Sequence, residues 1–136
     1  MYGRILIPVD MAQTDKAPFM IEAAKCLSNG NGKYILANIV LSMPALAELS
    51  VPPEFFERAN EEAEKKLSDI AKDAGIDANI VVRNGQPANE LLAIAKEMNV
   101  EAIIVGSHRP GFQDYLLGST AARVVRHAHC PVLVMR

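Results

Sequence analysis

Two kinds of apolar pattern alternate along the chain, and together they predict its secondary structure. Continuous apolar runs of about four to eight residues are typical of strands covered on both faces, whereas apolar residues three and four positions apart indicate one face of a helix. Runs of the first kind occupy residues 4–10, 34–41, 78–83, 102–105 and 131–135. We therefore expect five buried strands.

Four helices are expected between these strands. Helical spacing runs from residues 15–17 to 27, from 54 to 74, from 87 to 98 and from 119 to 127. Pro18 and Pro87 fit the first turn of a helix, where the missing N–H has no partner to lose. The longest helix carries an apolar stripe that begins at Phe56 and continues through Leu67 and Ile70. Its charged face is interpreted as solvated rather than as a binding motif.

Turn and loop signals separate these elements. Residues 29–32 and Gly75 have the chemistry that ends helices, and Asn84-Gly85 predicts a turn after the third strand. Residues 42–53 contain three prolines and predict a loop with room for a short helical turn at residues 45–49.

Strands thus alternate with helices, and no hairpin signal joins consecutive strands. This alternation predicts a parallel sheet with right-handed crossovers and helices on both faces, which is a doubly wound, Rossmann-like α/β fold. The chain of 136 residues is long enough to bury a core, so we expect residues 1–136 to form a single domain.

Composition and charge remove several classes of function. Half of the residues are hydrophobic and 22% are charged, which is ordinary for a soluble folded protein. The formal net charge of −2 gives no general attraction to nucleic acids or anionic membranes. No apolar stretch is long enough for a signal peptide or a membrane span. We therefore expect a cytoplasmic protein without nucleic-acid partners.

The two cysteines, Cys26 and Cys130, do not have the paired spacing of metal ligands. Cys26 lies in an apolar helical pattern and Cys130 lies just before the last strand. Both are interpreted as buried free thiols rather than a disulfide or redox pair, which fits a reducing compartment.

The candidate binding residues lie where strands end. Asp10 follows the first strand, at the edge where open α/β sheets bind ligands, and a ligand-binding role is favoured over the alternative that it caps the following turn. Gly106 follows the fourth strand, and Gly118-Ser119-Thr120 opens a helix. Glycine turns and a helix start present backbone N–H groups to an anion, so a nucleotide fits here with its phosphates on this loop, and Arg109 could add a charged contact.

Other known nucleotide-binding and catalytic motifs are absent from the sequence. No G-x-G-x-x-G follows the first strand, and neither a P-loop nor a G-x-S-x-G elbow occurs. His108 lies at the expected crevice without a candidate nucleophile or oriented base beside it, so a binding or loop-ordering role is favoured over catalysis. His127 and His129 are poorly spaced for a shared metal, and His127 is expected to favour a helix C-terminus.

These residues resemble the universal stress protein family. The resemblance is carried by residues 5–10 (ILIPVD), 106–110 (GSHRP), 115–120 (YLLGST), 124–128 (VVRHA) and 130–134 (CPVLV). It extends over essentially the whole chain, and it is greatest to small single-domain bacterial members with a Ser-His-Arg-Pro loop. It implies a five-stranded parallel sheet in the order 3-2-1-4-5, like that of adenine nucleotide alpha hydrolases. It also implies a homodimer paired through the last strand, Pro131 to Met135, or a dimer of dimers.

The resemblance further implies a site for ATP and Mg²⁺. ATP-binding members carry the pattern G-x-x-G-x9-G-[ST]; here Gly106 and Gly118-Ser119 match its ends, Arg109 stands at the second glycine, and the spacer is one residue shorter. By position, Asp10 and the backbone of Ile39 would contact ribose and adenine, and Asp10 would share Mg²⁺ with the phosphates. The walls of the adenine site would be Pro8, Val9 and Val105. The triphosphate would be held by Gly106, His108, Arg109, Gly118, Ser119 and Thr120.

The leading expectation is an ATP-binding universal stress protein that acts as a nucleotide-dependent regulator in the stress response. Any ATP hydrolysis should be slow, because no general base is evident. Two alternatives stay open: a member that has lost ATP and acts only through protein–protein contacts, and an adenylyl-transferring enzyme on a similar scaffold, whose signature pyrophosphate loop the sequence lacks.

Overall fold

The five expected strands form one parallel sheet. In the computed structural model, which describes residues 1–41, 52–107 and 117–136, the strands are β1 (Arg4–Pro8), β2 (Lys33–Leu41), β3 (Ala78–Gly85), β4 (Ala102–Gly106) and β5 (Val132–Met135). Their order is β3-β2-β1-β4-β5, and every neighbouring pair is parallel. The predicted fold class and strand order are confirmed.

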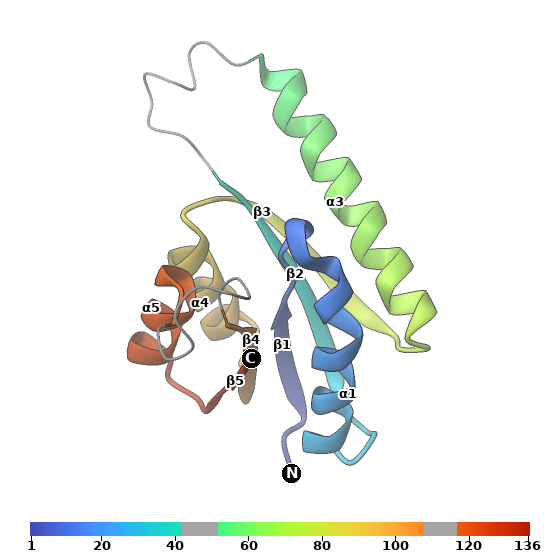
Figure 1. Cartoon of the computed structure of the whole chain (residues 1–136), viewed down its shortest axis with the longest axis vertical. Helices are drawn as coiled ribbons and strands as arrows, with labels where there is room; N and C mark the ends of the chain where they lie inside the picture. The colour runs from blue at the N-terminus through green and yellow to red at the C-terminus, as the bar shows by residue number, and fades with distance from the viewer. Residues whose placement is uncertain (42–51, 108–116) are drawn as a thin grey trace.

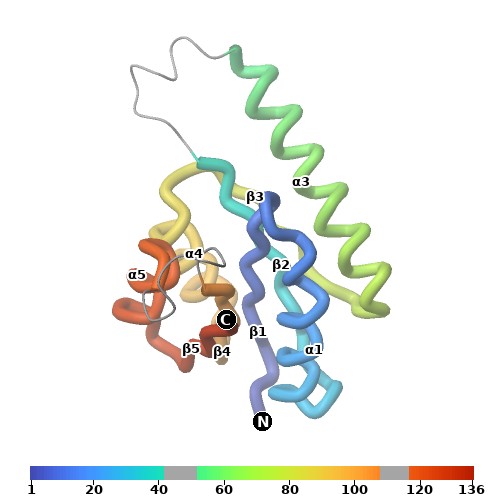
Figure 2. Tube along the Cα trace, in the orientation of Figure 1, coloured from blue at the N-terminus to red at the C-terminus, as the bar shows by residue number. Residues whose placement is uncertain are grey.

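Helices cover both faces of the sheet. They are the 3₁₀ helix η1 (Met11–Lys16) and the α-helices α1 (Ala17–Leu27), α3 (Pro53–Asp73), α4 (Pro87–Glu97) and α5 (Ser119–His127). Figures 1 and 2 show α1 and α3 on one side of the sheet and α4 and α5 on the other. Among the described helices, none combines the length and the apolar composition that crossing a bilayer would require. The loop expected at residues 42–53 falls almost wholly outside the described residues.

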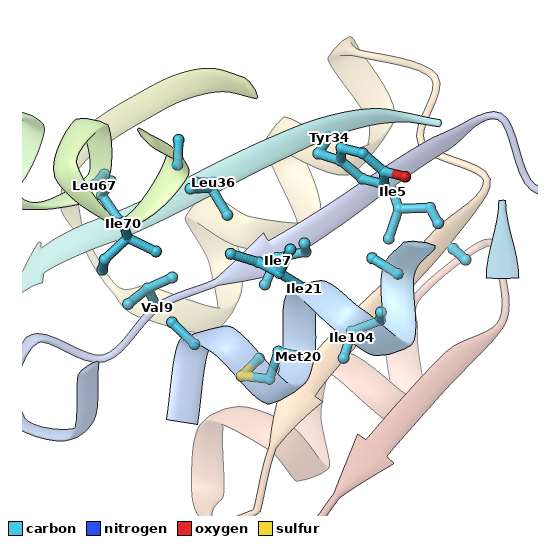
Figure 3. Packing of buried hydrophobic residues seen from close by; sticks show 14 residues of the cluster. Ile5, Ile7, Val9, Met20, Ile21, Tyr34, Leu36, Leu67, Ile70 and Ile104 are labelled. Atoms are coloured by element: carbon cyan, nitrogen blue, oxygen red, sulfur yellow. The ribbon is translucent and has the colours of Figure 1, made fainter. Parts of the chain in front are cut away.

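The core has two halves because side chains alternate along each strand. Ile5 and Ile7 of β1 point to the face covered by α1 and α3, whereas Leu6 between them points to the face covered by α4 and α5. On the first face, Figure 3 shows Ile21 of α1 and Leu67 of α3 packing toward these strands. A continuous apolar run is therefore what a strand with two buried faces needs.

A buried pair of hydroxyl groups joins the end of α1 to β2. The Ser28 hydroxyl donates to the Ala24 carbonyl at 2.9 Å, and its oxygen lies 2.8 Å from the Tyr34 hydroxyl oxygen. Ser28 and Tyr34 are each only 5% exposed. The two hydroxyl groups therefore share a hydrogen bond inside the core.

Two expectations about local structure were wrong. Asn84-Gly85 is not a turn but the end of β3, because β2 continues to Leu41 and supplies partners as far as Gly85. Cys26 is exposed rather than buried. It follows the buried Ala24 by two positions, which places it on the opposite side of a helix with about 3.6 residues per turn.

The apolar stripe expected along α3 is confirmed. The buried residues of α3 begin at its middle and include Ala63, Leu67 and Ile70, whereas Phe56 near its start is only half-buried. The apolar stripe is therefore partly covered, and the neighbouring Phe55 is 63% exposed.

Candidate functional site

A pocket of about 320 Å³ lies at the carboxyl edge of the sheet. This volume falls in the range of small-molecule sites, about 300 to 1,000 Å³. The pocket is lined by the ends of β1, β2 and β4, by η1 and the start of α1, by the first turns of α4, and by the start of α5. Parallel strands bring their carboxyl ends to one edge, which is why segments far apart in the sequence meet here.

Nine of the eleven site residues expected from the sequence line this pocket. They are Pro8, Val9, Asp10, Ile39, Val105, Gly106, Gly118, Ser119 and Thr120. The other two, His108 and Arg109, lie outside the described residues. The structure thus brings the described candidates together, and their binding roles remain predictions.

Two hydrogen bonds fix the backbone where β1 ends. The N–H of Val9 donates to the Ala37 carbonyl at 2.8 Å, and the side-chain amide of Asn38 donates to the Val9 carbonyl at 2.9 Å. Both polar groups of the Val9 backbone are therefore tied to β2, which holds the next residue, Asp10, at the pocket. Asn38 was not expected from the sequence as a site residue.

Asp10 has a structural role as well as a place in the pocket. Its Oδ1 accepts the N–H of Ala12 at 2.9 Å and so caps η1, as the alternative interpretation had it. The residue is nevertheless exposed and lines the pocket. One carboxylate can serve both purposes, because its two oxygens offer about four acceptor positions.

The start of α5 forms the opposite side of the pocket. Gly118 precedes the first helical residue with φ −62° and ψ 159°, and its carbonyl accepts the N–H of Ala122 at 2.9 Å. Glycine has no side chain to accept the N–H groups of Ser119, Thr120 and the residue after them. Since these groups carry the positive end of the helix dipole, an anion would be favoured here. His127 lies in the last turn, as expected.

Apolar side chains wall the deeper part of the pocket. Val9 and Val105 are each 4% exposed, and Met20 and Leu91 are similarly buried. Gly106 also lines the pocket, and a Cβ built on it would approach the Met20 sulfur to 3.9 Å, an ordinary contact. The combination suits a ligand with a flat apolar part and an anionic part.

Lys16 is a charged pocket residue that the sequence interpretation missed. Its Nζ lies 3.4 Å from the carbonyl oxygen of Ser107, the residue that follows β4, and both residues line the pocket. Ser107 in turn donates its N–H to the Met135 carbonyl of β5 at 2.6 Å. The signal that could have revealed Lys16 is its place in the connection between the first strand and the first helix, because such connections lie at the ligand-binding edge.

Among the described residues, the ionisable groups with shifted pKa values lie away from the pocket. Arg83 of β3 and Glu97 of α4 form an ion pair, and the hydrogen bond from Arg83 holds the pKa of the Glu97 carboxyl below its usual value. The same bond raises the pKa of Arg83. Burial raises the pKa of the Cys130 thiol.

Within the described ranges, no group of three or more His, Cys, Asp or Glu side chains could hold a metal ion. Of the lining residues that the structure describes, Asp10 is the carboxylate. A metal bound there would therefore need further oxygen ligands from a bound molecule.

Comparisons with known proteins agree over the whole chain. The model of the "Universal stress protein family" matches residues 1–136. "Universal stress protein G" of Shigella flexneri is 31% identical over 145 residues, covering all of both chains. The solved structure of hypothetical protein MJ0577 is 29% identical with a TM-score of 0.81, and the match covers 99% of this chain and 96% of that one.

Two further solved structures hold ligands. A universal stress protein in complex with cAMP is 24% identical with a TM-score of 0.66, and the match covers 99% of this chain and 97% of that one. A universal stress protein from Archaeoglobus fulgidus in complex with dAMP is 21% identical with a TM-score of 0.64, covering 99% and 98%. At these identities the likeness shows a shared fold.

Proposed function

Since the chain belongs to the universal stress protein family, we propose that its pocket binds ATP with Mg²⁺ and that the protein acts as a nucleotide-dependent regulator in the stress response. One observation carries the proposal: a single pocket combines buried apolar walls with an acidic side chain and an uncapped helix start. Those three features match the base, the ribose and the phosphates of a nucleotide.

The proposed mode of binding follows the chemistry of the lining. Adenine lies between Val9, Ile39 and Val105, which offer apolar surface beside polar backbone. Asp10 accepts hydrogen bonds from ribose hydroxyl groups and shares Mg²⁺ with phosphate oxygens. The phosphates lie against Gly106 and residues 118–120, with His108 and Arg109 as further contacts. Related structures that hold cAMP and dAMP support this proposal, because both ligands consist of adenine, a sugar and a phosphate.

We propose that any hydrolysis of ATP by this protein is slow. Asp10, the carboxylate among the described lining residues, already accepts the Ala12 N–H. A general base also has to reach the attacking water, and a capping carboxylate has less freedom to do so.

A homodimer is proposed through the edge of the sheet. β5 is the last strand in the sheet order and pairs with β4 on one side. Its Leu133 is 41% exposed, and an exposed apolar edge is a template for pairing with another strand. A charged residue at this position, Leu133→Lys, should convert a dimer to a monomer in light-scattering measurements, and a wild-type monomer would contradict the proposal.

The cytoplasm is proposed as the compartment. Cys26 and Cys130 are both free thiols, as expected where glutathione keeps cysteines reduced.

The test of nucleotide binding uses gently purified wild-type protein. Mass spectrometry of the released ligand should detect an adenine nucleotide, and isothermal titration after its removal should show binding of ATP-Mg²⁺. No co-purified nucleotide and no heat or thermal shift at millimolar ATP-Mg²⁺ would reject the proposal. That result would favour the alternative, a family member that acts only through protein–protein contacts.

A further inference from the structure

The side chain of Lys16 extends from the end of η1 to the carboxyl end of β4. Its ammonium nitrogen is 3.4 Å from the Ser107 carbonyl oxygen, while the residue itself lines the pocket. This contact is longer than the usual 2.7 to 3.2 Å of an N–H···O hydrogen bond, so it is a weak one. Among the described residues it is the one hydrogen bond of this ammonium group.

The position of the Lys16 charge in the pocket indicates which part of a ligand it would contact. Ser107 directly follows Gly106, which belongs to the end of the pocket where phosphates are proposed to lie. Lys16 is half-buried and lines the pocket together with Ala17 and Met20, and its charged end lies at the Ser107 carbonyl. Among the described lining residues, Lys16 is the cationic one.

The positive charge of Lys16 has the same sign as the partial charge on the opposite side of the pocket. There, the first-turn N–H groups of α5 carry a partial positive charge, and Gly118 contributes no side-chain acceptor. An ammonium group facing a helix start across a pocket disfavours a cation between them and favours an anion, above all one with several negative charges.

We infer that Lys16 sets the preference of this pocket for nucleotides with more phosphate groups over the nucleoside. The inference rests on the proposed nucleotide binding and adds a residue that the family pattern of glycines does not include. On binding, the ammonium group would exchange its weak contact with the Ser107 carbonyl for a charge-assisted hydrogen bond to a phosphate oxygen. Lys16 would contribute little to the affinity for adenosine, which has no phosphate.

The experiment compares wild type with Lys16→Met, which keeps a long apolar stem and removes the charge. Isothermal titration measures the affinities for adenosine, AMP, ADP and ATP, each at low and high salt. Lys16→Arg keeps a positive charge, and Lys33→Met is the matched control, because Lys33 is exposed at the first residue of β2, at the opposite edge of the sheet. Thermal unfolding without ligand reports whether any variant has lost stability.

The expected result is a change in selectivity. Lys16→Met should bind ATP about tenfold more weakly than wild type, as expected for the loss of one charge-assisted contact, while its affinity for adenosine stays the same. The dependence of ATP affinity on salt should become shallower, because one screened attraction is gone. Lys16→Arg should retain most of the ATP affinity, and Lys33→Met should match wild type.

Two results would overturn the inference in distinguishable ways. If wild type binds ATP but Lys16→Met loses affinity for adenosine and ATP equally, or for neither, the role of Lys16 is refuted and nucleotide binding stands. If wild type binds none of the four compounds, the proposed function fails and the inference fails with it.

Discussion

A pair of substitutions at Gly118 separates the charge of the phosphate site from its shape. Gly118 has the extended backbone that any residue can adopt before a helix, with φ −62° and ψ 159°. Gly118→Asp and Gly118→Asn introduce side chains of almost equal size, and both are good helix caps. The two variants differ in one negative charge at a residue that lines the pocket.

The two substitutions should not harm the fold. Replacing glycine by Asp or Asn before a helix raises stability by a few tenths of a kcal/mol, and a carboxylate at this end of α5 gains roughly 0.3 to 1 kcal/mol from the helix dipole. The free energy of unfolding of Gly118→Asp should therefore equal or exceed that of wild type in urea denaturation.

In contrast to stability, the affinity of Gly118→Asp for ATP should fall. Two unit charges about 4 Å apart repel by about 4 kcal/mol at an effective dielectric constant of about 20. Even half of that repulsion weakens binding about thirtyfold. We therefore expect Gly118→Asp to bind ATP at least about thirtyfold more weakly than Gly118→Asn, while both bind adenosine with the same affinity.

Isothermal titration of the two variants side by side measures this difference, with Gly118→Asn as the control for the added side chain. Equal affinities of Gly118→Asp and Gly118→Asn for ATP would refute the reasoning, because the phosphates could not then lie at the start of α5. Loss of ATP by both variants together with loss of adenosine would mean that the side chain blocks the pocket.

Three further predictions concern other parts of the molecule. Asp10→Asn should keep the cap of η1 and the free energy of unfolding, whereas Asp10→Ala should lose about 1 kcal/mol, and both should bind ATP-Mg²⁺ more weakly; equal stability of the two in urea would contradict the cap. Tyr34→Phe should cost about 1 kcal/mol of unfolding free energy, and Ser28→Ala should cost about 1 to 3 kcal/mol, because it leaves the buried Tyr34 hydroxyl without a partner; additive losses in the double variant would argue against the pairing. In a thiol titration of the folded protein, the exposed Cys26 should react first. Cys130 should react slowly and accelerate only at higher pH, because burial raises its pKa and so lowers its thiolate fraction; Cys26→Ser should abolish the fast phase.

The fold could be predicted because its signals are local and repeated. Ile5, Leu6 and Ile7 form an apolar run that makes sense only if both faces of the strand are covered, and the two halves of the core confirm it. Helix starts could be predicted as well, because Pro18 and Pro87 are tolerated only in a first turn, and both lie there.

Features that depend on tertiary partners could not be predicted. Gly85 belongs to a strand because Leu41 of the neighbouring strand pairs with it, and no local signal encodes that length. Cys26 lies among apolar residues in the sequence but on the exposed side of α1, since a short amphipathic helix leaves the facing of its last turn ambiguous. Lys16 lies in the connection after the first strand, which places it at the ligand-binding edge, but only the approach of β4 shows that its side chain lines the pocket.

The pocket is built from chain segments that are distant in sequence, at residues 8–10, 37–39, 105–107 and 118–121. No fragment of the chain contains it, so only the completed sheet can hold a ligand there. A molecule present at about one hundred times its dissociation constant would raise the unfolding free energy by about 2.7 kcal/mol. Proteases that act on opened chains would then degrade the loaded protein more slowly, so that its lifetime in the cell would follow the supply of the ligand.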